Sequence, residues 1–263
     1  MLLVIDVGNT NAVIGIFQNA KLINDWRIRT VKDSTEDEFN VLVTGLFREG
    51  NVDLQQINKT LISCVVPPMM SILDAFCTKY LGHSPLWIDA EAVASIMPIR
   101  YNNPSEVGAD RIVNAIAAYD KYKSCLIVID FGTATTFDVV SEKGEYLGGA
   151  ITPGIMISAE ALFQKASKLP RVEVFTPPKT AIGLDTASSM KSGIIYGYAG
   201  LVDGMVARIK KEMTGSPKVI ATGGLAPLIS HVAESIEAVE SSLTLEGLRI
   251  ISDHLSGLKK KGS

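Results

Sequence analysis

The stretch VIDVGNTNAVIGIF, residues 4–17, and the stretch VIDFGTATTFDVVS, residues 128–141, are two versions of one pattern. Each begins as an apolar run, reaches an aspartate (Asp6 or Asp130), passes through a glycine turn and resumes as a second run. Short apolar runs bounded by glycine and polar residues predict buried strands joined by a turn. Because the pattern occurs twice, we interpret the chain as two copies of one structural unit.

The match between the two halves extends through the turns. A constant offset of 124 residues pairs Asn9 with Thr133 and Val13 with Phe137, as well as the two aspartates. Each half continues with a third strand, which gives two three-stranded meanders. The repeat is therefore too long to be a local coincidence.

Alternating helices and strands are expected after each meander. In the first half, Thr35 and Glu38 form a capping-box pattern before an amphipathic helix that Gly50 ends. We expect further helices over about 69–80, 154–167 and 185–213, from about 225, and at the terminus from Thr244; further strands are expected over 60–66, 85–89, 218–224 and 236–239.

This order of elements predicts an α/β fold made of two duplicated lobes, with two mixed sheets flanked by helices. We expect an N-terminal lobe over residues 1–120 and a C-terminal lobe over 121–263. The boundary is expected near 118–124, at the end of a helix, because no Ser- or Pro-rich linker interrupts the chain.

Composition excludes several functions. The chain has 263 residues, 47% of them hydrophobic, and a formal net charge of −3, so no nucleic-acid partner is expected. No apolar run reaches the about 18 residues that a membrane span needs, and no membrane partner is expected. The three cysteines form no CxxC pair. We expect reduced thiols and a cytoplasmic protein.

Each glycine turn has the chemistry of a phosphate-binding site. Glycine lets a phosphate oxygen approach the backbone N–H groups, and the neighbouring asparagine and threonine side chains add hydrogen bonds. The aspartate would repel a bare phosphate but suits a cation bound to it. One such turn alone would be read as an ordinary hairpin. Two of them, facing each other across a cleft, would hold a polyphosphate from both sides.

The stretch IATGGLA, residues 220–226, allows two interpretations. It is either a plain strand–helix connection or a place where missing side chains leave room for a flat ligand such as adenosine. The chain contains neither a GxxxxGK[ST] phosphate loop nor a GxGxxG dinucleotide motif.

The segment YNNPSEVGADRIVNAIAAYDKY, residues 101–122, offers a proton acceptor. Asp110 falls in the first turn of a predicted helix, where the helix dipole stabilises a carboxylate. It is either a helix-start acid or the base that phosphoryl transfer to an alcohol requires. Arg111 is either a surface residue or a clamp for an anionic acceptor.

Taken together, these motifs resemble those of the type III pantothenate kinases over essentially the whole chain. The matching motifs are DVGNTN at 6–11, GADR at 108–111, DFGTATT at 130–136, GGAITPG at 148–154, ATGGLA at 221–226 and LTLEGLR at 243–249. The resemblance implies a duplicated ribonuclease-H-like fold of the actin-like, acetate and sugar kinase superfamily. DxGNT alone would indicate only that superfamily.

The resemblance also implies a reaction, its cofactors and an oligomeric state. ATP would phosphorylate pantothenate to 4′-phosphopantothenate, the first step of coenzyme A biosynthesis. The expected cofactors are Mg²⁺ and a monovalent cation, K⁺ or NH₄⁺. The expected assembly is a homodimer with the acceptor near the interface.

Site residues follow from the resemblance, position by position. Asp110 would accept the proton and Asp130 would bind potassium. The expected ATP-binding residues are Asp6, Val7, Gly8, Asn9, Thr10, Asn11, Ala12, Val13 and Thr133. The expected pantothenate-binding residues are Tyr101, Gly108, Ala109, Asp110, Arg111 and Thr186.

Two other classes of protein compete with this interpretation. One is another phosphotransferase or an exopolyphosphatase-like hydrolase of the superfamily, in which a carboxylate would activate water. The other is a non-catalytic, actin-like nucleotide-binding or regulatory protein. The presence of Asp6, Asp110 and Asp130 favours an active enzyme over a degenerate one.

Overall fold

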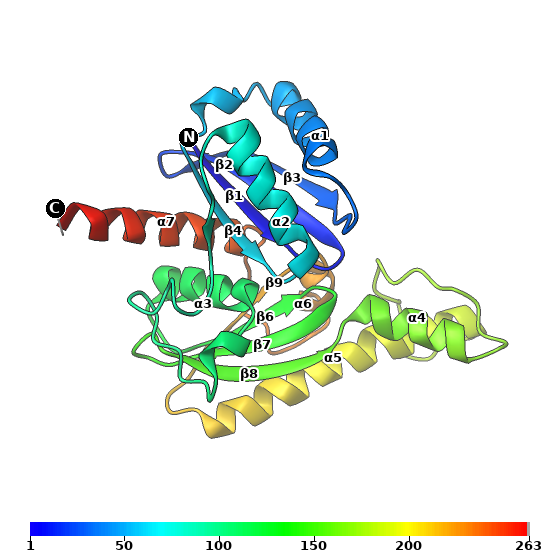
Figure 1. Ribbon diagram of the computed structural model, residues 1–263. Coiled ribbons are helices and arrows are strands. Elements are labelled where there is room, and N and C mark those ends of the chain that lie inside the picture. Colours follow the sequence, from blue (N-terminus) through cyan, green and yellow to red (C-terminus); the bar gives the residue numbers. More distant parts are fainter. Residues whose placement is uncertain (262–263) are drawn as a thin grey trace. The chain divides into compact units, whose positions relative to one another are not determined.

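The computed structural model describes residues 1–261, and side chains up to residue 257 (Figure 1). The chain divides into two compact units. The first comprises Met1–Ala117 together with Leu243–Ser263, and the second comprises Ala118–Ser242. The division falls inside one helix, α3 (Ala109–Tyr122).

The first unit is built on a five-stranded mixed sheet with the order β3-β2-β1-β4-β5. Its strands are β1 (Leu2–Val7), β2 (Asn11–Gln18), β3 (Lys21–Arg29), β4 (Lys59–Cys64) and β5 (Leu86–Trp87). Its helices are α1 (Glu36–Glu49), α2 (Pro67–Phe76), which continues into a π-helical turn (Cys77–Leu81), most of α3, and α7 (Leu243–Lys261); the short 3₁₀ turns are Leu54–Gln56 and Pro104–Glu106.

The two faces of this sheet are covered by different helices (Figure 1). Ile5, Val7 and Ile62 point into a core shared with α1 and α2. The other face of the sheet receives α7, whose Leu245 lies 3.1 Å from the position that a Cβ on Gly15 would take. Alternate residues of a strand face opposite sides, so the side chains between the core residues face α7.

Local sequence signals set the helix ends. Thr35 and Glu38 form the expected capping box, and Gly50 caps the end of α1. The helix expected near 69 begins earlier, at Pro67, because proline is well suited to the first turn of a helix, where its missing N–H is not needed. The expected strand at 85–89 is reduced to Leu86–Trp87.

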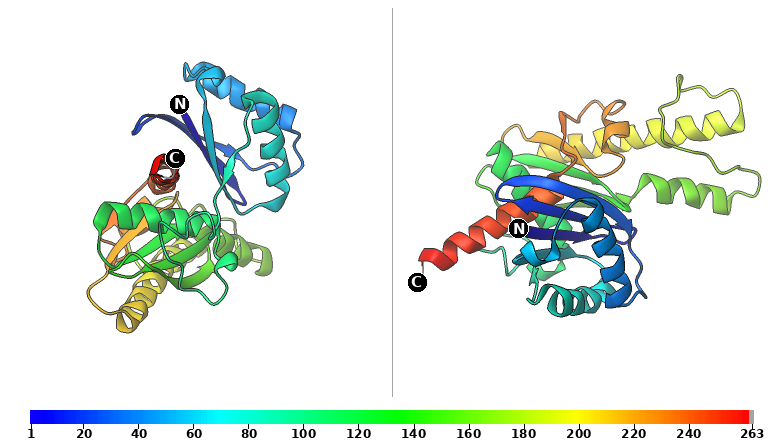
Figure 2. Two further views of the ribbon diagram at one scale, coloured as in Figure 1. Left: turned by 60° about the vertical axis from the view of Figure 1, so that its left-hand side comes forward. Right: turned by 90° about the horizontal axis from the view of Figure 1, so that it is seen from above.

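The second unit repeats this topology in a sheet with the order β10-β9-β6-β7-β8. Its strands are β6 (Leu126–Phe131), β7 (Ala134–Val140), β8 (Tyr146–Pro153), β9 (Lys218–Thr222) and β10 (Ala238–Val239). Its helices are α4 (Ile155–Lys165), α5 (Thr186–Glu212) and α6 (Ala226–Ser230). Figure 2 shows α4 lying beside the long helix α5.

The two units share one topology, as the sequence predicted. In each, three antiparallel strands are followed by two that are parallel to the first strand of the meander. The α/β fold with two mixed, helix-flanked sheets is therefore confirmed.

The constant offset between the halves holds only up to the turns. Asp6 stands opposite Val13 in the first hairpin, whereas Asp130 stands opposite Thr136 in the second. The expected match of Val13 with Phe137 is therefore displaced by one residue. The cause is a second turn that is one residue shorter than the first.

The terminal helix differs from the expected division into lobes. Residues 243–263 were expected in the C-terminal lobe, but they group with the first unit. The nitrogen Nζ of Lys59 donates hydrogen bonds of 2.8 Å to the Ser252 carbonyl and to the Ser256 hydroxyl. These bonds attach α7 to β4, a partnership between residues far apart in the sequence.

No helix in the described part of the chain is both long enough and apolar enough to cross a membrane.

Candidate active site

The first glycine turn connects β1 to β2 and is closed by its own backbone. The N–H of Gly8 donates to the Asn11 carbonyl at 3.0 Å. A neighbouring segment holds the turn from outside. The Thr30 hydroxyl donates to the Gly8 carbonyl at 2.7 Å, and the Thr30 N–H donates to the Thr10 carbonyl at 3.1 Å. These bonds use carbonyl oxygens and leave Asn9 and Thr10 exposed to solvent.

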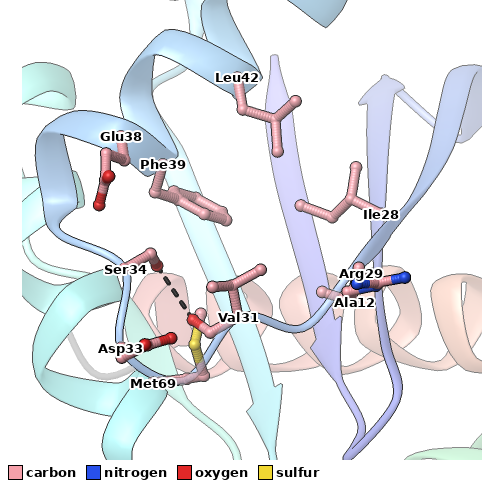
Figure 3. Close-up of a pocket in the computed structure, with 10 residues that line it drawn as sticks. All are labelled: Ala12, Ile28, Arg29, Val31, Asp33, Ser34, Glu38, Phe39, Leu42 and Met69. Atoms are coloured by element: carbon pink, nitrogen blue, oxygen red, sulfur yellow. Dashed lines mark hydrogen bonds between the residues drawn. The ribbon is translucent and has the colours of Figure 1, made fainter.

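The segment that holds this turn also lines a cavity of about 350 Å³ (Figure 3). Arg29, Val31 and Asp33 line the cavity, whereas Thr30 and Lys32 bond to the turn. The remaining lining residues are Ala12, Ile28, Ser34, Glu38, Phe39, Leu42 and Met69. Ala12, one of the predicted ATP-binding residues, also lines the cavity, so the cavity reaches β2 just beyond the first glycine turn.

Asp110 lies in the first turn of α3, as expected. Its Oδ1 accepts a 2.8 Å hydrogen bond from the N–H of Arg111. Desolvation raises the pKa of this carboxyl above its usual range, and this effect outweighs the hydrogen bond and the nearby Arg111 charge, which lower it. A carboxylate with a raised pKa is a better proton acceptor than an exposed one.

The absence of a side chain at Gly108 leaves room for this carboxylate. A Cβ at Gly108 would lie 2.6 Å from Asp110 Oδ1, which is closer than atoms can pack. The same Cβ would lie 3.6 Å from a methyl group of Val65, just beyond the end of β4. The GADR motif therefore needs glycine at its first position because the aspartate carboxylate occupies that space.

The end of β4 joins the two motifs of the first unit. Ser63 is the register partner of Asp6 across parallel strands, and the Val65 N–H donates to the Val7 carbonyl at 3.1 Å. Val65 in turn borders Gly108. The first glycine turn and the GADR motif are thus brought to the same end of one sheet, although about a hundred residues separate them in the sequence.

The second glycine turn, between β6 and β7, is also closed by backbone hydrogen bonds. The Gly132 N–H donates to the Ala134 carbonyl at 3.0 Å, and the Gly154 N–H donates to the Thr133 carbonyl at 3.2 Å. A Cβ on Gly154 would lie 2.2 Å from that carbonyl oxygen. The turn therefore packs backbone against backbone with the start of α4. Thr133 itself remains exposed to solvent.

The ATGG segment lies directly against Asp130. Gly223 has φ of +92°, and a Cβ there would lie 2.5 Å from Asp130 Oδ1 and 2.7 Å from the Phe131 carbonyl oxygen. The space beside Gly223 is therefore occupied by the aspartate turn itself. This contact explains why residue 223 is glycine, and room for a flat ligand beside the segment stays a prediction.

The remaining predicted residues occupy different settings. Arg111 is 7% exposed, so it is not the surface residue that the sequence also allowed. Tyr101 is exposed in the irregular segment before α3. Thr186 is the first residue of α5, directly after the Asp185 cap, and is exposed.

Comparison with known proteins decides the family. A family model described as type III pantothenate kinase matches residues 2–208. The chain belongs to the type III pantothenate kinase family. Relatives with that name include one from Desulforapulum autotrophicum, 66% identical over 96% of this chain and 97% of the relative. Another, from Desulfatibacillum aliphaticivorans, is 66% identical over 97% of this chain and 99% of the relative.

Solved structures support the fold of this type III pantothenate kinase family member. The Arthrobacter inorganic polyphosphate/ATP-glucomannokinase matches with a TM-score of 0.51 at 16% identity, covering 96% of this chain and 98% of that one. The activator of the 2-hydroxyisocaproyl-CoA dehydratase from Clostridium difficile, solved with bound ADPNP, matches with a TM-score of 0.52 at 12% identity, covering 98% and 97%. At such identities the likeness concerns the fold alone.

The acidic residues fit a cation that brings most of its own ligands. Across residues 1–261, no group of three or more His, Cys, Asp or Glu side chains gathers as a metal site. Mg²⁺ usually binds one or two carboxylates and keeps water and phosphate oxygens as its other ligands. Asp6 in a type III pantothenate kinase can therefore serve Mg²⁺ that arrives with a nucleotide.

Sequence reasoning missed the residues that support these motifs. Thr30 and Lys32 hold the first turn, and Ser63 and Val65 lie between it and GADR. Each lies at or just beyond the end of a strand. The sequence offered only that position as a signal, because their contacts depend on the pairing of distant segments.

Proposed function

We propose that this member of the family transfers the γ-phosphoryl group of ATP to the hydroxyl of pantothenate. The product is 4′-phosphopantothenate, and the reaction is the first step of coenzyme A biosynthesis. Family membership supports the substrate and the reaction. The single structural observation that carries the mechanism is the Asp110 carboxylate, held at a helix start with a raised pKa.

We assign the nucleotide phosphates to the two glycine turns. Backbone N–H groups and short polar side chains of residues 6–13 would bind them, and Thr133 would contribute from the second turn. The exposure of Asn9, Thr10 and Thr133 agrees with this role. Mg²⁺ bound with ATP would neutralise charge on the phosphoryl group.

Asp110 is the proposed general base. The hydroxyl oxygen of pantothenate forms a bond to the γ-phosphorus, and the bond from that phosphorus to the bridging oxygen of ADP breaks. The hydroxyl proton passes to the Asp110 carboxylate. The raised pKa of Asp110 favours this transfer, and the Arg111 N–H keeps the carboxylate oriented.

The acceptor would be bound around the same helix start. Gly108 and Ala109 supply close backbone approach, and the buried Arg111 guanidinium is the proposed partner of the pantothenate carboxylate. We also assign Tyr101 and Thr186 to acceptor binding. Their exposed side chains are available for a ligand.

We propose that Asp130 binds a monovalent cation, K⁺ or NH₄⁺. Its carboxylate lies at the end of β6, beside the Gly223 turn and the Phe131 carbonyl. Carboxylate and carbonyl oxygens are hard ligands that suit such a cation.

We propose a homodimer that uses the outer face of β8 and α4. Six large apolar side chains of these two elements are exposed: Leu147 and Ile151 on β8, and Met156, Ile157, Leu162 and Phe163 on α4. Apolar groups of this kind gathered on one surface are typical of an interface. A second copy of the chain would remove them from water. We place the enzyme in the cytoplasm, where ATP is available and its three free cysteines stay reduced.

The test is product formation by the purified chain. With ATP, Mg²⁺ and K⁺, we expect pantothenate-dependent release of ADP and 4′-phosphopantothenate identified by mass. Release of phosphate from ATP without pantothenate would instead indicate a hydrolase, and nucleotide binding without product would indicate a regulatory protein.

A further inference from the structure

Ser63 carries a buried hydroxyl that the described part of the chain leaves without a hydrogen-bond partner. The residue is 0% exposed, and its Oγ makes no hydrogen bond within residues 1–261. A buried hydroxyl without a partner destabilises the folded state, because it has lost its hydrogen bonds to water. Such a group in a native protein usually meets an ordered water or a ligand.

The position of this hydroxyl points to its partner. Ser63 on β4 and Asp6 on β1 are register partners in parallel strands, so their side chains leave the same face of the sheet. Both are at or next to the last residues of their strands, beside the first glycine turn. Ile62 faces the opposite side, into the core with α1 and α2.

Another polar residue of β4 shows the contrast. The Thr60 hydroxyl is also buried, but it is paired with His83 Nε2 at 2.9 Å. Thr60 lies three positions before Ser63 on the strand, and an odd offset places its side chain on the other face of the sheet. The strand thus provides an internal partner for one buried hydroxyl and not for the other.

We propose that Ser63 is a positioning residue for Asp6 in the binding of Mg²⁺·ATP. Its hydroxyl holds one ordered water that also bonds the Asp6 carboxylate, and this water fixes the carboxylate for the hydrated cation. The inference rests on the proposed function, because it needs the nucleotide at the first glycine turn. It assigns a role to a residue outside all the sequence motifs.

A purely structural serine would behave differently. Ser63→Ala removes a hydroxyl that has no hydrogen-bond partner among the described residues, so the melting temperature without nucleotide should stay the same or rise. Thr60→Val, the matched control, leaves His83 without its partner and should lower the melting temperature while nucleotide binding is unchanged. The two variants therefore have opposite expected signatures.

The test is a titration of the full chain with ATP, without pantothenate, followed by amide NMR shifts. Each variant is titrated once with Mg²⁺ and once with EDTA. For Ser63→Ala we expect about tenfold weaker binding of Mg²⁺·ATP, because loss of the water also removes the hydrogen bond from that water to the Asp6 carboxylate. Binding of metal-free ATP should be unchanged. Ser63→Thr, which keeps the hydroxyl, should restore most of the Mg²⁺-dependent affinity.

The outcomes separate the two claims. If the wild-type chain binds Mg²⁺·ATP more tightly than metal-free ATP and Ser63→Ala does the same to an equal degree, the role of Ser63 is refuted. Equal weakening with and without Mg²⁺, together with a lower melting temperature, would also refute it and indicate a structural serine. If the wild-type chain binds no ATP, the proposed function itself fails.

Discussion

Gly108 leaves the room that the Asp110 side chain occupies, because a Cβ on the glycine would lie 2.6 Å from the carboxylate oxygen Oδ1 of the aspartate. The same oxygen accepts the Arg111 N–H at 2.8 Å. The carboxylate is thus fixed by a hydrogen bond on one side and by the absence of a side chain on the other. This arrangement makes the position of the proposed base sensitive to changes at a residue that carries no chemistry.

Gly108→Ala should therefore impair catalysis while the protein stays folded. The added methyl forces the Asp110 carboxylate away from its position, and misplacing a catalytic group by about 1 Å can cost about 100-fold in rate. Steady-state kinetics should show the loss mainly in kcat. Gly45→Ala is the control, because a Cβ there meets nothing within 4 Å. Equal activity of the two variants would contradict the spatial link.

Asp110→Asn should reduce kcat by about 10²- to 10⁴-fold, the usual contribution of a general base. In the wild-type chain, activity should fall on the acid side at a pH above 3.8, the ordinary value for aspartate, because the raised pKa protonates the base earlier. Asp120→Asn, on the same helix and exposed, should keep full activity. A rate profile that is unchanged down to pH 4 would remove Asp110 as the base.

The same variant has a predicted effect on stability. Because the pKa of Asp110 is raised in the folded state, the folded chain binds more protons than the unfolded chain between the two pKa values. The free energy of unfolding contributed by this group therefore falls as the pH rises through that window. The difference in free energy of unfolding between Asp110→Asn and wild type should therefore favour the variant more at pH 7 than at pH 3.5. Urea unfolding at both pH values measures this difference, and an equal gain at both would contradict it.

Thr30→Val should weaken nucleotide binding. The substitution keeps the shape but removes the 2.7 Å hydrogen bond to the Gly8 carbonyl, which is worth about 1 kcal/mol. We expect the KM for ATP to rise about fivefold with kcat nearly unchanged. Ser34→Ala removes a hydroxyl of the same segment that donates to the Val31 carbonyl instead of the turn, and it serves as the control. If both variants raise the KM equally, Thr30 has no special link to the turn.

Gly223→Ala should disturb the cation response through Asp130. Its Cβ would lie 2.5 Å from the Asp130 carboxylate, in a backbone with φ of +92°. Gly215→Ala is a matched control, since its φ is +91° but its nearest neighbour is Cys125 Sγ at 3.4 Å. We expect both variants to lose stability from the backbone strain. Only Gly223→Ala should need more K⁺ for half-maximal activity, and an equal K⁺ requirement in both would contradict the assignment.

Ile151→Glu tests the proposed dimer face. The side chain is 62% exposed, so a charge there should not disturb folding of the isolated chain. Light scattering should show a dimer for wild type and a monomer for the variant at the same concentration. Val41→Glu changes a valine on α1 that is more exposed still, at 73%, and should leave the dimer intact. A monomeric wild type with full activity would refute the dimer.

The sequence was sufficient for the fold because its local signals agreed with the tertiary structure. The repeated strand–aspartate–glycine pattern predicted both meanders, and the Thr35 and Glu38 capping box predicted the start of α1. The one-residue shift in the second hairpin was not predictable. The hydrogen bond from the Gly132 N–H to the Ala134 carbonyl closes the second turn. The residue types of this turn do not indicate that it is one residue shorter than the first.

From the sequence, we could predict only those site residues whose side-chain type and local position indicate a role. Asp110 could be placed at a helix start from its spacing to apolar residues. The partnership of Ser63 with Asp6 could not, because it depends on the register between two strands that are far apart in the sequence. The attachment of α7 to the first unit depends in the same way on Lys59 and Ser252, which no local pattern connects.

The most direct test of the account is the mass of the product formed by wild-type chain and by Asp110→Asn from ATP, Mg²⁺, K⁺ and pantothenate. The account predicts 4′-phosphopantothenate from the wild type in an amount equal to the ADP released, and at least 100-fold slower formation by the variant. Product formation at the wild-type rate by Asp110→Asn, or ADP release by the wild type without phosphorylated pantothenate, would contradict it.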